Sequence, residues 1–217
     1  MTLTRIKICG ITSAEDACTV VRAGADAIGL NFFAGSKRRV SIEQAREIAA
    51  VVPPLVEIVA LFVDEPVTSI ERILSEVPIN LMQFHGQESA EFCQQFCRPW
   101  IKSIRVRPGL DLAQLCREYR LARGILLDSW QDGVHGGTGS TFDWRLAQGG
   151  LPLPLILAGG LHAGNVGAAI RTLQPAAVDL CSGVERAPGI KDAVKTRQFV
   201  AAVRAADQEM EHSSHDN

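Results

Sequence analysis

The sequence predicts an α/β protein built as a single (β/α)8 barrel, and two observations support this prediction. Short β-branched or aliphatic runs recur along the chain, and each is followed by a longer segment of helical periodicity. The alternation occurs eight times in 217 residues, so each unit has roughly 27 residues for one strand, one helix and two short loops. An open doubly wound sheet is less favoured, because Cys9-Gly10-Ile11-Thr12 after the first strand is not a glycine-rich dinucleotide loop.

The expected elements follow in chain order, the strands marked by apolar runs and the helices by periodicity and nearby Ser, Thr, Asn or Asp caps. The strands are expected at Arg5–Cys9, Ala27–Phe32, Val56–Val63, Leu81–His85, Trp100–Val106, Gly124–Ser129, Leu153–Ala158 and Ala177–Ser182. The helices are expected at Ser13–Ala23, Ile42–Val51, Val67–Glu76, Ser89–Phe96, Leu112–Tyr119, Phe142–Gln148, Gly164–Leu173 and Asp192–Ala206. Because no linker divides the chain, we expect one barrel domain over residues 1–206. The polar segment 207–217 has no periodicity and is expected to be a disordered tail.

The composition is that of an ordinary globular protein, with 47% hydrophobic and 21% charged residues. The formal net charge of −2 argues against a nucleic-acid partner, because such proteins normally carry a clustered excess of Lys and Arg. No apolar run is long enough to span a membrane, and the first ten residues lack the features of a signal peptide. The six cysteines are spaced neither as a disulfide framework nor as a zinc site, so we expect reduced thiols in a cytoplasmic protein without a metal.

In a barrel of this kind the active site forms at the C-terminal ends of the strands and in the loops that follow them. Two glycine-rich segments follow the last two strands and contain Gly159, Gly160, Ser182 and Gly183. Each alone is explained as a tight turn, but together, at the two loops where barrels commonly bind phosphate, they predict a phosphate site. A third cluster, Gly136-Gly137-Thr138-Gly139, follows the sixth strand and indicates either a mobile lid or further amide donors.

Cys9 and Asp128 are the candidate acid–base pair, because they lie on strands that face each other across the barrel mouth. Surrounding positive charge would make the Cys9 thiolate a base, and apolar surroundings would keep Asp128 protonated as an acid. The alternatives are a core thiol and a carboxylate that caps a helix. Strand alternation also places Lys7 inside the barrel, where a buried ammonium needs a partner. Since the eighth strand closes against the first, we expect Lys7 to pair with Asp179.

Ordered motifs along the chain resemble those of phosphoribosylanthranilate isomerase, an enzyme of tryptophan biosynthesis. They are Lys7-Ile8-Cys9-Gly10-Ile11-Thr12, Ser36-Lys37-Arg38, Gln83-Phe84-His85-Gly86, Leu127-Asp128-Ser129, Gly136-Gly137-Thr138-Gly139, Ala158-Gly159-Gly160-Leu161, Val178-Asp179 and Ser182-Gly183-Val184-Glu185. The similarity runs from Lys7 to about Phe199 and touches every βα unit. Single motifs are weak, but the ordered set is highly specific.

The resemblance implies an Amadori rearrangement of N-(5-phosphoribosyl)anthranilate to 1-(2-carboxyphenylamino)-1-deoxyribulose 5-phosphate, with no metal or organic cofactor. It implies that Asp128 protonates the ribose ring oxygen and that Cys9 removes the C2 proton. Arg38 matches the family arginine that holds the anthranilate carboxylate, a task suited to a guanidinium fork. His85 and Asp179 match active-site positions whose individual roles stay open.

Two positions depart from the family pattern. Lys37 stands where Pro is frequent, which would loosen the loop of Arg38, and Cys181 stands where Ser commonly precedes the Ser-Gly of the phosphate loop. The sequence leaves the oligomeric state open, with a monomer as the default and a dimer as the alternative. It also leaves open a second, related ribotide substrate.

Three alternatives to the isomerase fit the sequence less well. A ribulose-phosphate epimerase would need His and Asp metal ligands at the strand ends, and few are present. An indole-glycerol-phosphate synthase would carry an extra segment before the first strand. A barrel that only binds a phosphorylated small molecule would not require both Cys9 and Asp128.

Overall fold

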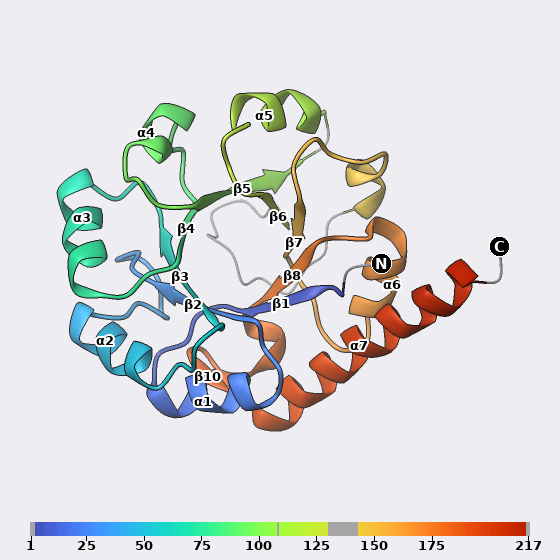
Figure 1. Cartoon of the computed structure of the whole chain (residues 1–217), viewed down its shortest axis with the longest axis horizontal. Helices are drawn as coiled ribbons and strands as arrows, with labels where there is room; N and C mark the ends of the chain where they lie inside the picture. The colour runs from blue at the N-terminus through green and yellow to red at the C-terminus, as the bar shows by residue number, and fades with distance from the viewer. Residues whose placement is uncertain (1–2, 108, 130–142, 216–217) are drawn as a thin grey trace.

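The structure, a computed structural model, describes residues 3–107, 109–129 and 143–215. Its eight parallel strands close into a barrel in which each strand pairs with the next and β8 pairs with β1, and the helices surround it (Figure 1). The strands are β1 (Arg5–Ile8), β2 (Ala27–Asn31), β3 (Glu57–Phe62), β4 (Leu81–Phe84), β5 (Trp100–Val106), β6 (Ile125–Ser129), β7 (Leu155–Leu157) and β8 (Ala177–Leu180). The predicted (β/α)8, or TIM, barrel is therefore confirmed.

The remaining elements lie outside the barrel wall. The α-helices are α1 (Ala14–Arg22), α2 (Ile42–Ala50), α3 (Val67–Glu76), α4 (Ala90–Gln94), α5 (Leu112–Glu118), α6 (Val166–Leu173) and α7 (Ala193–His215). Two 3-10 turns, η1 (Trp144–Ala147) and η2 (Ser182–Val184), precede β7 and follow β8. A small hairpin of β9 (Glu185–Ala187) and β10 (Ile190–Lys191) then leads into α7.

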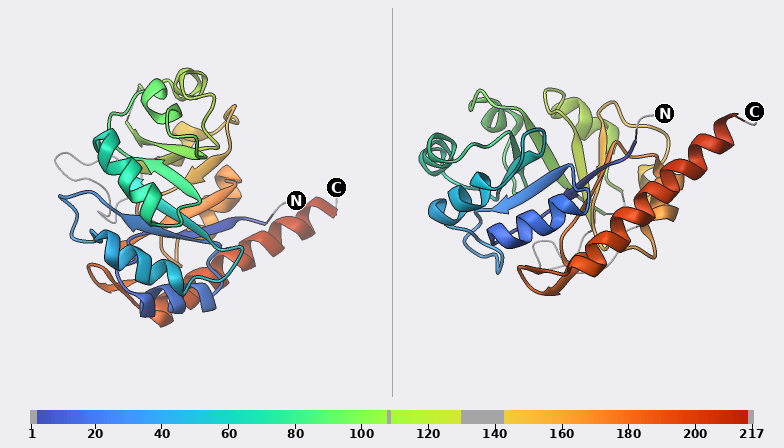
Figure 2. Two further views of the ribbon diagram at one scale, coloured as in Figure 1. Left: turned by 60° about the vertical axis from the view of Figure 1, so that its left-hand side comes forward. Right: turned by 60° about the horizontal axis from the view of Figure 1, so that its bottom comes forward.

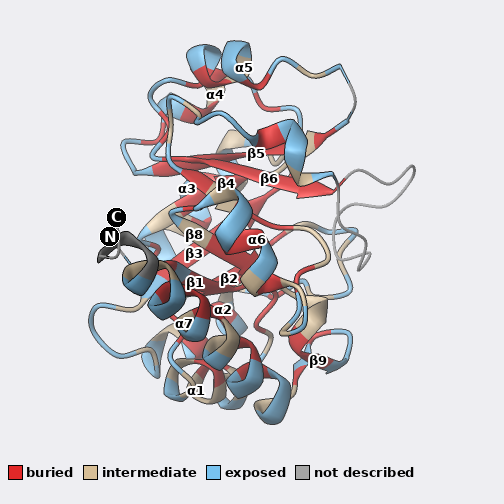
Figure 3. Ribbon diagram, turned by 90° about the vertical axis from the view of Figure 1, so that its right-hand side faces the viewer, coloured by how far each residue is buried: buried red, intermediate tan, exposed pale blue. Residues whose placement is uncertain are grey.

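Strand alternation divides the buried side chains into two layers, and the strands are buried while the outer faces of the helices are exposed (Figure 3). Ile125 and Leu127 of β6 belong to the large cluster between strands and helices. Leu126, between them, packs instead with Ile101 and Ala158 inside the barrel. A strand buried on both faces reads as a continuous apolar run, which is why these strands could be found in the sequence.

The helices begin where cap residues were expected. The hydroxyls of Ser13, Ser41 and Ser89 and the carboxylate of Asp111 each accept a hydrogen bond from a backbone N–H in the first turn of the helix that follows. In the described part of the chain, no helix combines the length and the apolar character needed to cross a membrane.

The helix expected at Phe142–Gln148 is a single 3-10 turn, η1, and Phe142 itself lies outside the described residues. Asp143 caps this turn and also pairs with Arg145 at 2.7 Å. Gly149 and Gly150 follow with positive φ angles of 103° and 77°. The turn has already ended at Gln148, whose ψ of 155° is extended, and the two glycines keep the chain from resuming a right-handed helix.

The segment expected to be a disordered tail from residue 207 is helical as far as His215, because α7 continues along the barrel and projects beyond it (Figure 2). Asp207 is buried, and it accepts a hydrogen bond of 2.6 Å from the hydroxyl of Thr4. Met210 packs against the main hydrophobic cluster. The contact of Asp207 with Thr4 and the packing of Met210 attach this segment, whose own sequence carries no periodicity, to the barrel.

Candidate active site

A cavity of about 480 Å³ opens at the C-terminal ends of the strands. It collects the predicted site residues that the structure describes: Cys9, Arg38, His85, Asp128, Gly159, Gly160, Asp179, Ser182 and Gly183. The glycine cluster predicted as a lid, Gly136 to Gly139, lies outside the described residues. These predicted residues come from six of the eight βα units, and Leu61 and Val63 of a seventh unit also line the cavity.

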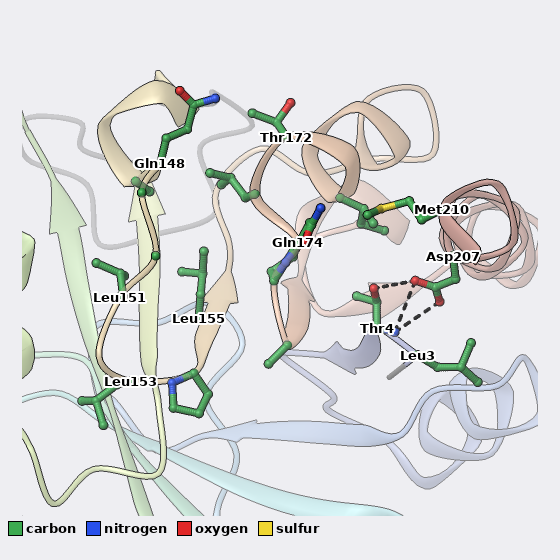
Figure 4. Close-up of a pocket in the computed structure, with 18 of the residues that line it drawn as sticks. Leu3, Thr4, Gln148, Leu151, Leu153, Leu155, Thr172, Gln174, Asp207 and Met210 are labelled. Carbon is green, nitrogen blue, oxygen red and sulfur yellow. Dashed lines mark hydrogen bonds between the residues drawn. The ribbon is translucent and has the colours of Figure 1, made fainter. Parts of the chain in front are cut away.

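A second cavity, of about 790 Å³, lies at the opposite end of the barrel (Figure 4). It is lined by residues that precede β1, β7 and β8, together with parts of α6 and α7. Asp207, which reaches this cavity, is already engaged by the backbone N–H and hydroxyl of Thr4, as Figure 4 shows. The smaller cavity is the candidate site, because it holds the acid–base and glycine residues at the catalytic end of the fold.

Lys7 and Asp179 form the predicted ion pair inside the barrel. The Lys7 Nζ lies 2.9 Å from the Asp179 Oδ1, and both side chains are almost completely buried. Burial by itself would lower the pKa of Lys7, but the Asp179 carboxylate and the Cys9 thiol raise it above its ordinary value. Gly29 on β2 leaves room for this group, since a Cβ there would lie 2.8 Å from the Cys9 sulfur and 3.0 Å from the Lys7 Nζ.

The Cys9 thiol is buried at the end of β1, beside Leu61 and Val63. Burial raises the pKa of Cys9, whereas the ammonium groups of Lys7 and Lys191 act in the opposite direction. The positive charge expected around this residue is present, but desolvation outweighs it. The thiol is therefore favoured over the thiolate in the substrate-free site.

Asp128 lies on β6, and polar groups surround its carboxylate, not the apolar residues that were expected. Its Oδ1 accepts a hydrogen bond of 2.8 Å from the N–H of Ser129, and its Oδ2 lies 3.4 Å from the His85 Nε2. The side-chain amide of Gln83 donates to the His85 Nδ1 at 3.0 Å, which in this amide orientation places the imidazole proton on Nε2. Ser103 contacts the same Nε2 at 3.3 Å. These contacts orient His85 toward Asp128.

Arg38 points into the cavity from the loop after β2. Its guanidinium makes a bidentate pair with Glu185, with Nε–Oε1 and Nη2–Oε2 distances of 2.8 and 2.6 Å. The hydroxyl of Ser36 closes the loop, because it accepts hydrogen bonds from the Arg38 N–H and from the Asn31 side chain. The loop is therefore tied on both sides of Lys37.

The two glycine-rich segments form one continuous surface. A Cβ on Gly183 would clash with the carbonyl oxygen of Leu161, so the loop after β8 lies directly against the loop after β7. Gly159 has φ = +84°, and a Cβ there would lie 2.6 Å from the backbone nitrogen of Ser129. Neither position has room for a Cβ, and the positive φ of Gly159 also favours glycine. The cavity is therefore lined with backbone at these two residues.

Comparison with known proteins identifies the family that has this arrangement. The family model described as N-(5'phosphoribosyl)anthranilate (PRA) isomerase matches residues 6–202. The chain belongs to the phosphoribosylanthranilate isomerase family. A relative named N-(5'-phosphoribosyl)anthranilate isomerase from Pseudomonas putida strain W619 is 54% identical over 206 residues, which are 95% of this chain and 100% of the relative.

Solved structures of this family have the same fold. One, from Thermotoga maritima, is described as monomers generated from a dimeric phosphoribosylanthranilate isomerase; it has a TM-score of 0.82 and 37% identity and covers 94% of this chain and 100% of its own. A second is a family enzyme in complex with reduced 1-(o-carboxyphenylamino)-1-deoxyribulose 5-phosphate, with a TM-score of 0.82, 38% identity and the same coverage.

Two charged residues that contact the site, Glu185 and Lys191, were not predicted as site residues from the sequence. Lys191 is buried, and its Nζ contacts the Cys9 carbonyl oxygen at 2.6 Å and the Glu185 Oε1 at 2.9 Å. The Pro188-Gly189 pair is a turn signal that marks the hairpin between β9 and β10. No sequence pattern, however, shows that this hairpin folds back onto β1. Across the described ranges, no group of three or more His, Cys, Asp and Glu side chains is arranged to hold a metal ion.

Proposed function

We propose that this chain is a phosphoribosylanthranilate isomerase of tryptophan biosynthesis, which converts N-(5-phosphoribosyl)anthranilate to 1-(2-carboxyphenylamino)-1-deoxyribulose 5-phosphate. The observation that supports this most directly is that Cys9 and Asp128 line one cavity together with the backbone surface of Gly159 and Gly183. That cavity offers two proton-transfer groups and an anion site, which are what an aldose-to-ketose rearrangement of a phosphorylated sugar requires. The steps below need no metal or organic cofactor.

In the first step Asp128 acts as the general acid. It gives a proton to the ribose ring oxygen, the bond from that oxygen to C1 breaks, and the nitrogen lone pair forms an iminium at C1. The Ser129 N–H engages the Oδ1 of Asp128, so Oδ2 is the oxygen placed to transfer the proton. His85, 3.4 Å from Oδ2, lies on the other side of this carboxyl from the Ser129 N–H and helps to position it.

In the second step Cys9 acts as the general base. Its thiolate takes the C2 proton, and the electrons of the C–H bond form the C1–C2 double bond of an enolamine as the iminium nitrogen regains its lone pair. The enolamine then gains a proton at C1 and loses the proton of the C2 hydroxyl, which yields the ketone. Because burial raises the pKa of Cys9, this step becomes faster as the pH rises toward that pKa.

Binding is assigned to groups on the rim and floor of the cavity. Glu185 occupies the Nε and Nη2 side of Arg38, so the anthranilate carboxylate would meet the remaining edge of the guanidinium. The phosphate would lie against Gly159, Gly160, Ser182 and Gly183. Asp179 accepts a hydrogen bond from Lys7, so we assign it a supporting role inside the barrel and not a direct contact with the substrate.

We propose that a monomer is sufficient for turnover, because every residue assigned above comes from one chain. A dimer would leave this chemistry unchanged. We also place the enzyme in the cytoplasm, since the reaction requires a reduced Cys9 and all six cysteines are free thiols.

The test is an assay of the fluorescence of phosphoribosylanthranilate, generated in situ, without added metal. Cys9→Ser and Asp128→Asn should each lose about a hundred- to ten-thousand-fold in kcat. Cys18→Ser, which removes a thiol from α1, is the matched control and should retain wild-type kcat. An inactive wild-type protein would refute the isomerase, and an active Cys9→Ser would refute the assignment of the base.

A further inference from the structure

The hairpin of β9 and β10 places a buried lysine behind the residue proposed as the base. The side chain of Lys191 is 0% exposed. Its Nζ lies 2.6 Å from the carbonyl oxygen of Cys9, 3.3 Å from that of Cys181 and 3.6 Å from the Cys181 sulfur. The ammonium therefore joins the ends of β1 and β8, where the chain turns toward the cavity.

Glu185 connects this ammonium to Arg38. Its Oε1 accepts hydrogen bonds from the Lys191 Nζ at 2.9 Å, from the Arg38 Nε at 2.8 Å and from the Gly189 N–H at 3.2 Å. Its Oε2 accepts from the Arg38 Nη2 at 2.6 Å. One buried carboxylate thus binds two cations, one directed at the strand of the base and one at the cavity, and the cluster of these three residues carries a net charge of +1.

Five charged or titratable groups face the Cys9 thiol. They are Lys7 on β1, Arg38 after β2, Asp179 on β8, Cys181 after β8 and Lys191 on β10. Lys7 is paired with Asp179 and Arg38 is paired with Glu185 at bidentate distance. Lys191 is also paired with Glu185, but its shortest contact, at 2.6 Å, is to the backbone carbonyl oxygen of Cys9 itself. Removing the charge of Lys191 should therefore change both the ionisation of the Cys9 thiol and its orientation in the cavity.

We propose that Lys191 is a positioning residue of the isomerase site, which fixes the backbone of Cys9, stabilises the Cys9 thiolate and, through Glu185, couples the base to Arg38. The inference rests on the proposed function, because it assigns Lys191 a role through the proposed base. It differs from a purely structural role in one respect. A structural lysine would affect stability alone, whereas removal of this one should also change the ionisation of Cys9, whose carbonyl oxygen lies 2.6 Å from the Lys191 Nζ.

The experiment compares Lys191→Met with Lys195→Met, which removes the ammonium of an exposed residue at the start of α7 that donates to the backbone oxygen of Glu185. Alkylation of Cys9 by iodoacetamide is followed against pH in the substrate-free protein, with mass spectrometry of the Cys9 peptide to separate it from the other thiols. In Lys191→Met the midpoint should rise by about one pH unit, which slows alkylation below the midpoint about tenfold. The kcat of Lys191→Met should fall by a similar factor with KM little changed, because Glu185 still holds Arg38.

Wild-type values of the alkylation midpoint and kcat in Lys191→Met would overturn the proposal. If Lys191→Met does not fold, the double variant Lys191→Met/Glu185→Gln replaces both charges by groups of similar size. It should give the same shift in alkylation, now with a raised KM, and a wild-type midpoint in this variant would equally refute the role of Lys191. Because alkylation needs no turnover, a shifted midpoint in a protein without isomerase activity would refute the proposed function alone.

Discussion

The ion pair of Glu88 and Lys102 offers a test of the energetics away from the reacting groups. The Glu88 Oε2 lies 2.7 Å from the Lys102 Nζ, and the two side chains are 2% and 4% exposed. Glu88 also accepts hydrogen bonds of 2.9 Å from the N–H groups of Asp64 and Gly86, so it ties the loops after β3 and β4 together. The second of these loops follows directly from His85.

Glu88→Gln removes the negative charge and leaves the Lys102 ammonium buried without a counter-ion, near the Gly86 carbonyl oxygen at 2.8 Å and the Tyr119 ring at 5.7 Å. Breaking a buried pair in this way costs about 3–5 kcal/mol. For a chain of this size each kcal/mol lowers the Tm by about 2–4 °C, so we expect a fall on the order of 10 °C. This is a large part of the stability of a typical domain.

Urea unfolding followed by circular dichroism measures the effect, and Glu76→Gln on α3 is the matched control. Glu76 pairs with Arg72 at 3.0 Å, but these side chains are 36% and 67% exposed, so the same substitution there should cost at most about 0.5 kcal/mol. If the two substitutions lower the free energy of unfolding equally, burial does not determine how much these ion pairs stabilise the protein, and the argument is refuted.

Two further predictions concern the cavity. Burial tends to raise the pKa of Glu185, but Arg38 and Lys191 hold it down at about 2, below the ordinary value of 4.5. The ionised carboxylate therefore contributes stability that is complete above pH 4.5 and is lost as the pH falls from 4.5 to 2. The difference in unfolding free energy between wild type and Glu185→Gln should shrink by up to about 3 kcal/mol over this range. A difference that stays constant with pH would contradict the prediction. Gly159→Ala should raise KM about tenfold and destabilise the protein by about 1–3 kcal/mol, because φ = +84° is strained for alanine and its Cβ would meet the backbone of Ser129. In Gly149→Ala, where φ is +103° and the Cβ has open space, we expect some loss of stability and an unchanged KM.

The regular part of the fold could be predicted because strand and helix positions follow from local patterns. Trp100–Val106 and Val67–Glu76 have the predicted bounds, since each is an uninterrupted apolar or amphipathic run. The structure differs from the prediction in the segments where the regular pattern of strands and helices stops. η1 is a short turn, and the end of α7 depends on contacts made by Asp207 with residues near the start of the chain.

The candidate site could be predicted in outline for a different reason. The barrel rule fixes which strand ends face the cavity, so Cys9, His85, Asp128 and Asp179 could be identified before their distances were known. The ion pair of Lys7 and Asp179 followed from closure of β8 against β1, with the two residues directly opposite each other in the register. The polar surroundings of Asp128 did not follow, because they come from the N–H of Ser129 and from His85 after β4, a strand that is not adjacent to β6 in the barrel.

The sequence by itself determined the barrel, the strand ends that carry the chemistry and the glycines that line the cavity, because periodicity, turn chemistry and motif order are local properties of the chain. Only the tertiary structure decided the ionic partners. Arg38 meets Glu185 across 147 residues, and Lys191 meets the carbonyl of Cys9 across 182. A side chain's charge is visible in the sequence, but its burial and its partner depend on which segments the closed barrel brings together. Burial and charged partners determine the pKa of Cys9, and the pair with Glu185 determines the orientation of the Arg38 guanidinium.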